Sequence, residues 1–337
     1  MSALLRAEGL TKTFTVSSGM FTRQPVAAVA HVDLTLNHGE VLGLVGESGS
    51  GKTTLARCLL GLTPIDSGRI TFDGTDITHA KGKTRTEFRR RVQPVFQDPF
   101  GSIDPRWSVG RTVREALDAY RIGKPGDRDR RVSELLERVG LRPEFAHRRP
   151  RQLSGGQRQR VGIAAALATE PDVIVADEPV SALDVSVQAQ ILNLFADLQS
   201  DLGVAVLFVA HDLSVVKHIS QRVAVLYLGR VVETADVHDL FTQARHPYTR
   251  ALLQASPQPD PTRPLDHTPL GGEIPSPLDP PTGCAFHTRC PLVTPRCVTD
   301  LPTLLPTTPT HETACWVTTP RPDEAPTTDL RSTTHHQ

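Results

Sequence analysis

The sequence predicts an α/β fold with a mostly parallel sheet that helices cover on both faces. Three continuous apolar runs, at residues 41–45, 173–176 and 204–209, indicate strands that are buried on both sides. Segments with helical patterns separate these runs, and strands that alternate with helices pair in parallel. A glycine-rich loop directly after the first run, followed by a helical segment, is typical of the same class.

Two further parts attach to this sheet. Residues 1 to about 76 alternate more between apolar and polar and contain turn signals such as Asp73-Gly74, which predicts an antiparallel β part. Residues from about 99 to 160 are mostly helical in pattern and predict a helical subdomain. Within it, the apolar spacing from Val132 to Val139 indicates a helix that ends at Gly140.

The composition changes after residue 255. Nine prolines lie among residues 255–283, which predicts a stiff, extended linker over residues 256–283. A cysteine-bearing module follows at residues 284–317. Residues 318–337 are rich in Thr, Pro and charge and predict a disordered tail. We therefore expect one large domain over residues 1–255 with a small C-terminal extension.

Charge and hydropathy give no support to some classes of protein. Lys plus Arg and Asp plus Glu both number 37, so the net charge is zero, whereas nucleic-acid binding usually needs a basic excess. No stretch approaches the ~18–20 apolar residues that span a bilayer, and the N-terminus lacks a signal-peptide pattern. We expect a cytoplasmic chain that reaches a membrane only through a partner, and no nucleic-acid partner.

The glycine-rich loop at residues 46–53 has the pattern and the strand–loop–helix setting of a P-loop. Its glycines let backbone N–H groups face a β-phosphate, and the helix N-terminus adds positive potential. Lys52 would neutralise the β- and γ-phosphates, and the Thr53 hydroxyl would bind Mg²⁺. The expected ATP-binding residues of this segment are Gly46, Glu47, Ser48, Gly49, Ser50, Gly51, Lys52, Thr53 and Thr54.

Two carboxylates end the second apolar run. Asp177 lies where P-loop enzymes hold Mg²⁺, and Glu178 would polarise the attacking water as a general base. Upstream, residues 153–157 read Leu-Ser-Gly-Gly-Gln and precede a helical segment, so the N–H groups at its start predict an anion site. The residues of this predicted site are Ser154, Gly155, Gly156 and Gln157.

These motifs, in this order, resemble those of ABC ATPases over residues 1 to about 250. Residues 153–157 are similar to the family's signature, Gln97 resembles the Q-loop glutamine, and His211 resembles the switch histidine. Asp184 belongs to a segment that resembles the D-loop, and Phe14 stands where the family places an aromatic ring against adenine.

The resemblance implies a mechanism. Two such subunits would sandwich two ATP molecules, with the signature of one capping the γ-phosphate held by the P-loop of the other. Glu178, His211 and Gln97 would act in hydrolysis, and Thr53, Gln97 and Asp177 would hold Mg²⁺. The expected fold is thus an ABC-type P-loop NTPase with a mostly parallel core sheet, an antiparallel β part, a helical subdomain and a small Cys-bearing C-terminal extension.

The C-terminal part of the sequence indicates which kind of ABC ATPase the chain resembles. Residues 246–253, 272–277 and 283–291 resemble the C-terminal extension of ATPases from dipeptide and oligopeptide importers, which nickel and glutathione importers share. Residues 95–99, 102–106 and 216–220 resemble the F-type of the two paralogous ATPases in such importers. This implies ATP-driven import of peptides or a related small solute.

The implied assembly has a second ABC ATPase subunit (a paralogue or a copy), two membrane permeases and an extracytoplasmic solute-binding protein, with this chain on the cytoplasmic face of the membrane. The alternative is a soluble ABC ATPase that acts on nucleic acid or ribosomes. A single P-loop and the lack of a heptad insertion favour the transporter.

Four of the five cysteines lie close together near the C-terminus. In a cytosolic chain such a cluster suggests a metal site, and its short, Pro-rich segment has too little apolar area to order itself without a staple. Four thiolates suit Zn²⁺ or an Fe–S cluster, and the resemblance implies a [4Fe–4S] cluster; reduced thiols without a metal are the third alternative. The residues concerned are Cys284, Cys290, Cys297 and Cys315.

Overall fold

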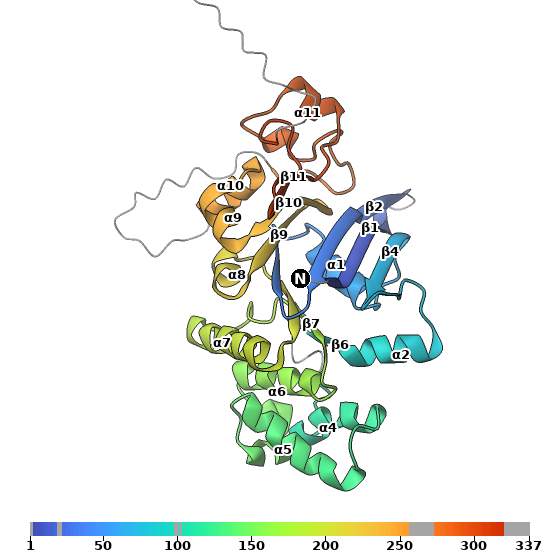
Figure 1. Cartoon of the computed structure of the whole chain (residues 1–337), viewed down its shortest axis with the longest axis vertical. Helices are drawn as coiled ribbons and strands as arrows, with labels where there is room; N and C mark the ends of the chain where they lie inside the picture. The colour runs from blue at the N-terminus through green and yellow to red at the C-terminus, as the bar shows by residue number, and fades with distance from the viewer. Residues whose placement is uncertain (1–2, 19–21, 98–100, 102, 256–272, 320–337) are drawn as a thin grey trace, which may run out of the picture.

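The computed structural model describes residues 3–18, 22–97, 101, 103–255 and 273–319, and its centre is a mixed sheet (Figure 1). Within the described residues, the sheet has eight strands in the order β11-β12-β10-β9-β3-β8-β7-β6. Strands β6, β7, β8, β3 and β9 pair in parallel, and β9, β10, β12 and β11 pair antiparallel. The bounds are β3 (Val41–Val45), β6 (Val92–Val95), β7 (Val173–Asp177), β8 (Ala205–Val209), β9 (Arg222–Tyr227), β10 (Arg230–Asp236), β11 (Leu305–Thr308) and β12 (His311–Thr313). The three apolar runs are therefore strands of a mostly parallel sheet, as predicted.

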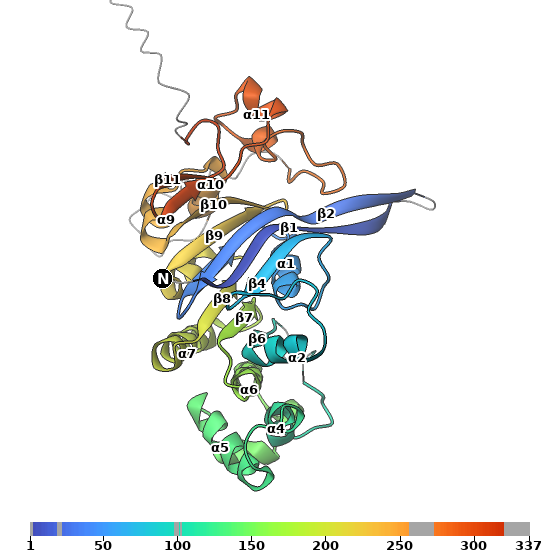
Figure 2. The same ribbon diagram turned by 45° about the vertical axis from the view of Figure 1, so that its right-hand side comes forward.

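The early residues form the predicted antiparallel part. A second sheet has the order β2-β1-β4-β5, with β1 (Ala3–Ser18), β2 (Thr22–Asn37), β4 (Ser67–Phe72) and β5 (Thr75–Asp76). Asp73 and Gly74 both have positive φ, 50° and 73°, and make the turn between β4 and β5. Figure 2 shows β1 and β2 as a long curved ribbon beside β9 and β10.

Helices cover both faces of the core sheet. Successive residues of β3 alternate between two hydrophobic cores, because side chains of a strand point to opposite faces. Val41 and Val45 join the core of α6, α7 and α8, whereas Leu42 and Leu44 join the core of α1 and the antiparallel sheet. The helices outside the helical subdomain are α1 (Lys52–Leu59), α2 (Gly82–Arg91), α7 (Val185–Leu202), α8 (Leu213–Ile219), α9 (Val237–Gln243), α10 (Pro247–Ala255) and α11 (Pro295–Thr299).

The helical subdomain lies at one end of the molecule, opposite α11 (Figures 1 and 2). It contains α4 (Val109–Ala119), α5 (Arg128–Arg138) and α6 (Gly155–Leu167) with the 3₁₀ turns η1 (Pro125–Asp127), η2 (Pro143–His147) and η3 (Pro150–Gln152). The helix α5 is capped at Val139 and is followed by Gly140 with φ 74°, which is the predicted stop. The predicted Q-loop flank at residues 98–100 and 102 lies outside the described residues.

The C-terminal module is ordered by docking on the ATPase sheet. Its strand β12 pairs with β10, with Glu233 opposite Thr313, so the module extends the core sheet at one edge. Phe286, only 1% exposed, is part of the same hydrophobic core as β3. Strand pairing and an apolar anchor thus hold the module on the ATPase domain. The predicted linker lies outside the described residues over 256–272, and so does most of the predicted tail, at 320–337.

Candidate functional site

The P-loop joins β3 to α1 and needs glycine where it passes close to other backbone. Gly51 has φ 103°, and a Cβ there would lie 2.1 Å from the carbonyl oxygen of Ala28 on β2. A Cβ at Gly46 would lie 2.2 Å from the carbonyl oxygen of Leu226 on β9. Neither approach is possible for a residue with a side chain. The loop is thus held against β2 and β9 by close backbone approaches that only glycine allows.

Lys52 lies inside this loop and is 5% exposed. Its ammonium donates to the carbonyl oxygens of Gly46 and Glu47, both at 2.9 Å, and lies 3.5 Å from Ser50 Oγ. Burial lowers the pKa of Lys52, and the charges of Glu178, Asp177 and Glu47 oppose that shift. A buried ammonium held only by neutral oxygens is suited to receive phosphate oxygens.

Thr53 and Asp177 face each other across the start of α1 and the end of β7. The Thr53 hydroxyl donates to Asp177 Oδ1 at 3.1 Å. Asp177 is 7% exposed, and burial raises its pKa against the hydrogen bond from Thr53. A carboxylate and a hydroxyl in a partly desolvated position are ligands that Mg²⁺ prefers, so this pair fits the expected metal.

Two predicted residues converge on one carboxylate oxygen of a third, Glu178. Gln97 Nε2 donates to Glu178 Oε2 at 3.1 Å, and His211 Nδ1 lies 3.4 Å from the same oxygen. They follow β6, β7 and β8, which are parallel neighbours, so their carboxyl ends meet at one edge. Glu178 has a positive φ of 47°, which is rare for a residue with a long side chain and which stores strain at this edge. Its carboxylate is thereby held at the end of the strand.

The predicted anion site stands at the start of α6. Ser154 is the N-cap: its Oγ accepts from the N–H of Gln157 at 3.3 Å, and its own N–H donates to Gln157 Oε1 at 3.0 Å. Asp184 caps α7 in the same way, with Oδ1 accepting from the N–H of Val187 at 3.0 Å. Figures 1 and 2 show α6 apart from α1. Ser154 and Asp184 are exposed, so a second molecule can reach them, whereas Gly156 is buried against Val187 of α7.

Two family models match the chain. Residues 29–181 match the ABC transporter model, and residues 232–297 match the C-terminal region of oligopeptide/dipeptide transporters. A probable peptide ABC transporter ATP-binding protein, y4tS of Sinorhizobium fredii, is 50% identical over 94% of this chain and 91% of its own length. The oligopeptide transport ATP-binding protein AppF of Bacillus subtilis is 45% identical over 93% of this chain and 96% of its own length.

The chain belongs to the ABC transporter family of ATP-binding proteins. The residues that match the ABC transporter model include the P-loop, the Asp177-Glu178 pair and residues 153–157, and the match to AppF agrees with the F-type expectation. Among solved structures, the dimeric post-hydrolysis state of the ATP-binding cassette MJ0796, bound to ADP and Pi, is similar to this chain. The TM-score is 0.62 and the identity 30%, over 69% of this chain and 98% of the other.

Phe14, the residue expected against adenine in this ABC ATPase, lies on β1. Its ring is 41% exposed, with the ammonium of Lys12 5.4 Å from the ring centroid. An exposed ring beside a cation is free to stack on a base. Cys58, by contrast, is 1% exposed in α1, as expected for a small side chain on the buried side of a helix.

The four C-terminal cysteines do not form the expected metal site. Among the described residues, which include all four, no group of three or more His, Cys, Asp or Glu side chains is placed to hold an ion. The thiols are neighbours nonetheless: burial raises the pKa of Cys284 to about 11, and the other three cysteines add to that shift. The expected [4Fe–4S] cluster and the zinc alternative thus find no support, because the module's packing leaves the thiols near one another without converging.

One contact of the P-loop is not indicated by any motif of the sequence. Glu47 forms an ion pair with Arg289 of the C-terminal module, and its N–H donates to the hydroxyl of Tyr248. Glu47 and Arg289 are 242 positions apart, so no motif spacing relates them. The sequence shows the opposite charges of Glu47 and Arg289 and the family resemblance of the two segments that contain them. Only the fold brings the two side chains together.

Proposed function

We propose that this chain hydrolyses ATP to power the import of peptides, as one of two ATPase subunits on the cytoplasmic face of a membrane complex. The observation that carries the proposal is the convergence of Gln97 and His211 on Glu178 Oε2, next to a P-loop with a buried lysine. The names of the relatives, which are peptide transport proteins, support the substrate class. In the described residues no helix has the length and apolar character to cross a membrane, so transport requires partner subunits.

The chain's own residues supply the parts of a hydrolysis site. Lys52 exchanges its loop carbonyls for the β- and γ-phosphate oxygens, and Thr53 and Asp177 hold Mg²⁺, which offsets the phosphate charge. Glu178 accepts the proton of the attacking water as a general base. Gln97 fixes the orientation of that carboxylate, and His211 lies on the same side to reach the γ-phosphate. Phe14 stacks on the adenine ring.

A second subunit completes each site. Ser154, Gly155 and Gly156 begin α6 away from the P-loop of their own chain, so the anion that they cap belongs to the nucleotide of a partner. The dimeric state of MJ0796 with ADP and Pi supports this arrangement. ATP then binds the closed pair better than the open pair and shifts the population towards closure, and hydrolysis reopens it.

The remaining partners follow from the same proposal. They are two membrane permeases, a second ABC ATPase that is a paralogue or a copy, and an extracytoplasmic solute-binding protein. In this division residues 1–255 form the ATPase domain, residues 99–160 its helical subdomain, and residues 284–317 the attached module. No observation favours a nucleic-acid or ribosomal partner, and the zero net charge does not support one.

Purification of the tagged chain from its native cells in mild detergent tests the proposal. We expect two permeases, a second ATPase and a solute-binding protein in the eluate, identified by mass spectrometry and absent from an untagged control. Recovery of ribosomal or DNA-repair proteins without a membrane subunit would contradict the transporter function and leave the ATPase assignment intact.

A further inference from the structure

The C-terminal module reaches the P-loop through one arginine. Arg289 ends the 3₁₀ turn η4 (His287–Arg289), and its guanidinium makes two parallel bonds to the Glu47 carboxylate: Nη1 to Oε2 at 2.9 Å and Nη2 to Oε1 at 3.1 Å. The side chain of Arg289 is 4% exposed and that of Glu47 is 20% exposed. A bidentate, buried pair fixes both distance and orientation.

Glu47 is also bonded through its backbone. Its N–H donates to the Tyr248 hydroxyl at 2.9 Å, and its carbonyl oxygen accepts from the ammonium of Lys52 at 2.9 Å. The residue is therefore held from outside the P-loop by η4 and α10, and it in turn holds the lysine that faces the phosphates. Glu47 thus connects Arg289 to Lys52, because its carboxylate binds the guanidinium and its carbonyl oxygen binds the ammonium.

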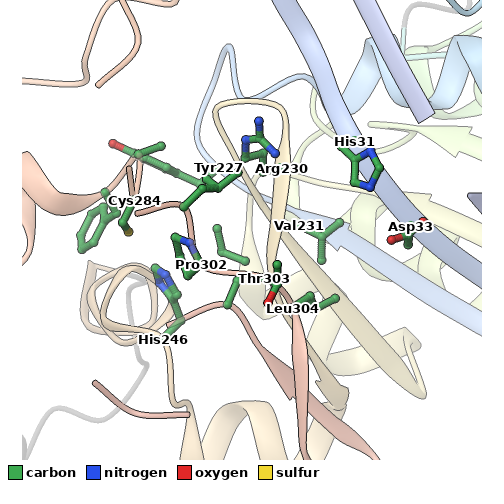
Figure 3. Close-up of a pocket in the computed structure, with 15 residues that line it drawn as sticks. His31, Asp33, Tyr227, Arg230, Val231, His246, Cys284, Pro302, Thr303 and Leu304 are labelled. Atoms are coloured by element: carbon green, nitrogen blue, oxygen red, sulfur yellow. The ribbon is translucent and has the colours of Figure 1, made fainter. Parts of the chain in front are cut away.

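Arg289 is itself fixed by an aromatic cluster, made of Tyr227, Tyr248 and Phe286. The ring centroids lie 4.5 Å apart for the two tyrosines, and 5.4 Å from each tyrosine to Phe286. All three side chains are at most 1% exposed. Figure 3 shows Tyr227 beside Cys284 where the module meets β9 and β10. Arg289 thus projects from a segment that is packed on a buried aromatic cluster, and not from an exposed loop.

The charge of Glu47 links its ion pair with Arg289 to nucleotide binding. The carboxylate lies close enough to Lys52 to influence its ammonium, and a triphosphate carries several negative charges into the same loop. The guanidinium of Arg289, paired with this carboxylate, offsets part of its charge. Without Arg289, the carboxylate would compete with the phosphates for Lys52 and repel them.

We propose that Arg289 is a positioning residue for the ATP site, through which the C-terminal module sets the affinity of the P-loop for nucleotide. It contacts neither the phosphates nor the attacking water. It acts by pairing with the Glu47 carboxylate and so offsetting that charge beside Lys52. The inference rests on the proposed ATPase function and adds the module to the residues that this function depends on.

The test compares ATP KM and kcat of the full-length chain with those of Arg289→Gln, together with equilibrium binding of a fluorescent ATP analogue. We expect KM and the dissociation constant to rise about tenfold, with kcat within about twofold of the wild type. Arg296→Gln is the matched control: Arg296 lies in the same module and stacks on Trp316 at 3.7 Å, and its KM should not change. Unchanged KM and binding in folded Arg289→Gln would overturn the proposal.

The second variant separates positioning from general stability. In Glu47→Gln/Arg289→Gln the competing carboxylate is gone, so KM should be at least about threefold lower than in Arg289→Gln. A double variant as weak as the single one would overturn the proposal, because Arg289 would then only support the fold. Should Arg289→Gln fail to fold, Arg289→Lys replaces it. A rise of about threefold in the KM of Arg289→Lys, removed when Glu47→Gln is added, supports the proposal. A wild-type KM in Arg289→Lys overturns it. Wild-type protein that binds no ATP would instead refute the proposed function.

Discussion

Truncation of Phe286 to alanine should detach the C-terminal module from the ATPase domain before the domain unfolds. Phe286 is 1% exposed, and its ring lies 5.4 Å from both Tyr227 and Tyr248 and 5.9 Å from His246. Burial of a phenylalanine side chain contributes about 2 kcal/mol, and two aromatic contacts add about 1 kcal/mol each. The sum, about 4 kcal/mol, agrees with the usual cost of a buried Phe→Ala change.

A single tryptophan can report on the module alone. The chain has two tryptophans, and Trp316 lies in the module, where its Nε1 donates to the Asp300 carbonyl oxygen at 2.8 Å. In a Trp107→Phe background, urea unfolding followed by Trp316 fluorescence should shift to a lower midpoint in Phe286→Ala. Far-ultraviolet circular dichroism, which follows the helices of the ATPase domain, should show a later transition.

Val298→Ala is the matched control, because Val298 is an apolar residue of the same module that is 41% exposed. Its cost should be within about 0.5 kcal/mol. If Phe286→Ala shifts the Trp316 transition no more than this control does, Phe286 is not the anchor of the module, and the packing argument is wrong.

Three further predictions concern single residues. Glu178→Gln keeps the size of the side chain but removes the base, so ATP turnover should fall at least about 100-fold with ATP binding retained, and wild-type turnover would refute the assignment. Burial lowers the pKa of His246 to about 4, so the unfolded state takes up the proton first and up to about 3 kcal/mol of stability should be lost as the pH falls from 6.5 to 4; a thermal scan in which His246→Gln has the same pH slope as the wild type would contradict this. Asp184→Ala removes the cap of α7 and should cost about 1 kcal/mol, whereas Asp184→Asn should cost less; equal melting temperatures for all three proteins would show that the cap is dispensable.

The sequence predicted the nucleotide site because its signals are local. A P-loop needs glycines, a lysine and a helix start within a few residues, and these stand next to an apolar strand in the chain. Parallel strands then bring their carboxyl ends to one edge, which is why Gln97, Glu178 and His211, each just after a strand, lie together. The antiparallel part and the stop at Gly140 were equally local.

The contacts that the sequence did not predict join distant segments. Strand β12 has three residues and pairs with β10 more than 70 positions away, so neither its length nor its pattern distinguishes it from a loop. The partner of Glu47 is hidden for the same reason. The spacing of Cys284 and the three other C-terminal cysteines indicated that the thiols lie near one another, but not whether they point to one centre. The packing of Phe286 and β12 sets the course of the backbone in this module.

We propose that ATP hydrolysis assisted by Glu178 drives peptide movement through partner subunits. The most direct test of this proposal is peptide uptake into proteoliposomes that contain the complex purified through this chain, with ATP on the side of the ATPases. We predict uptake that requires ATP and falls at least about 100-fold in Glu178→Gln, although the variant complex still assembles and binds ATP. Uptake that Glu178→Gln leaves unchanged, or a complete complex that hydrolyses ATP and moves no peptide, would contradict the account.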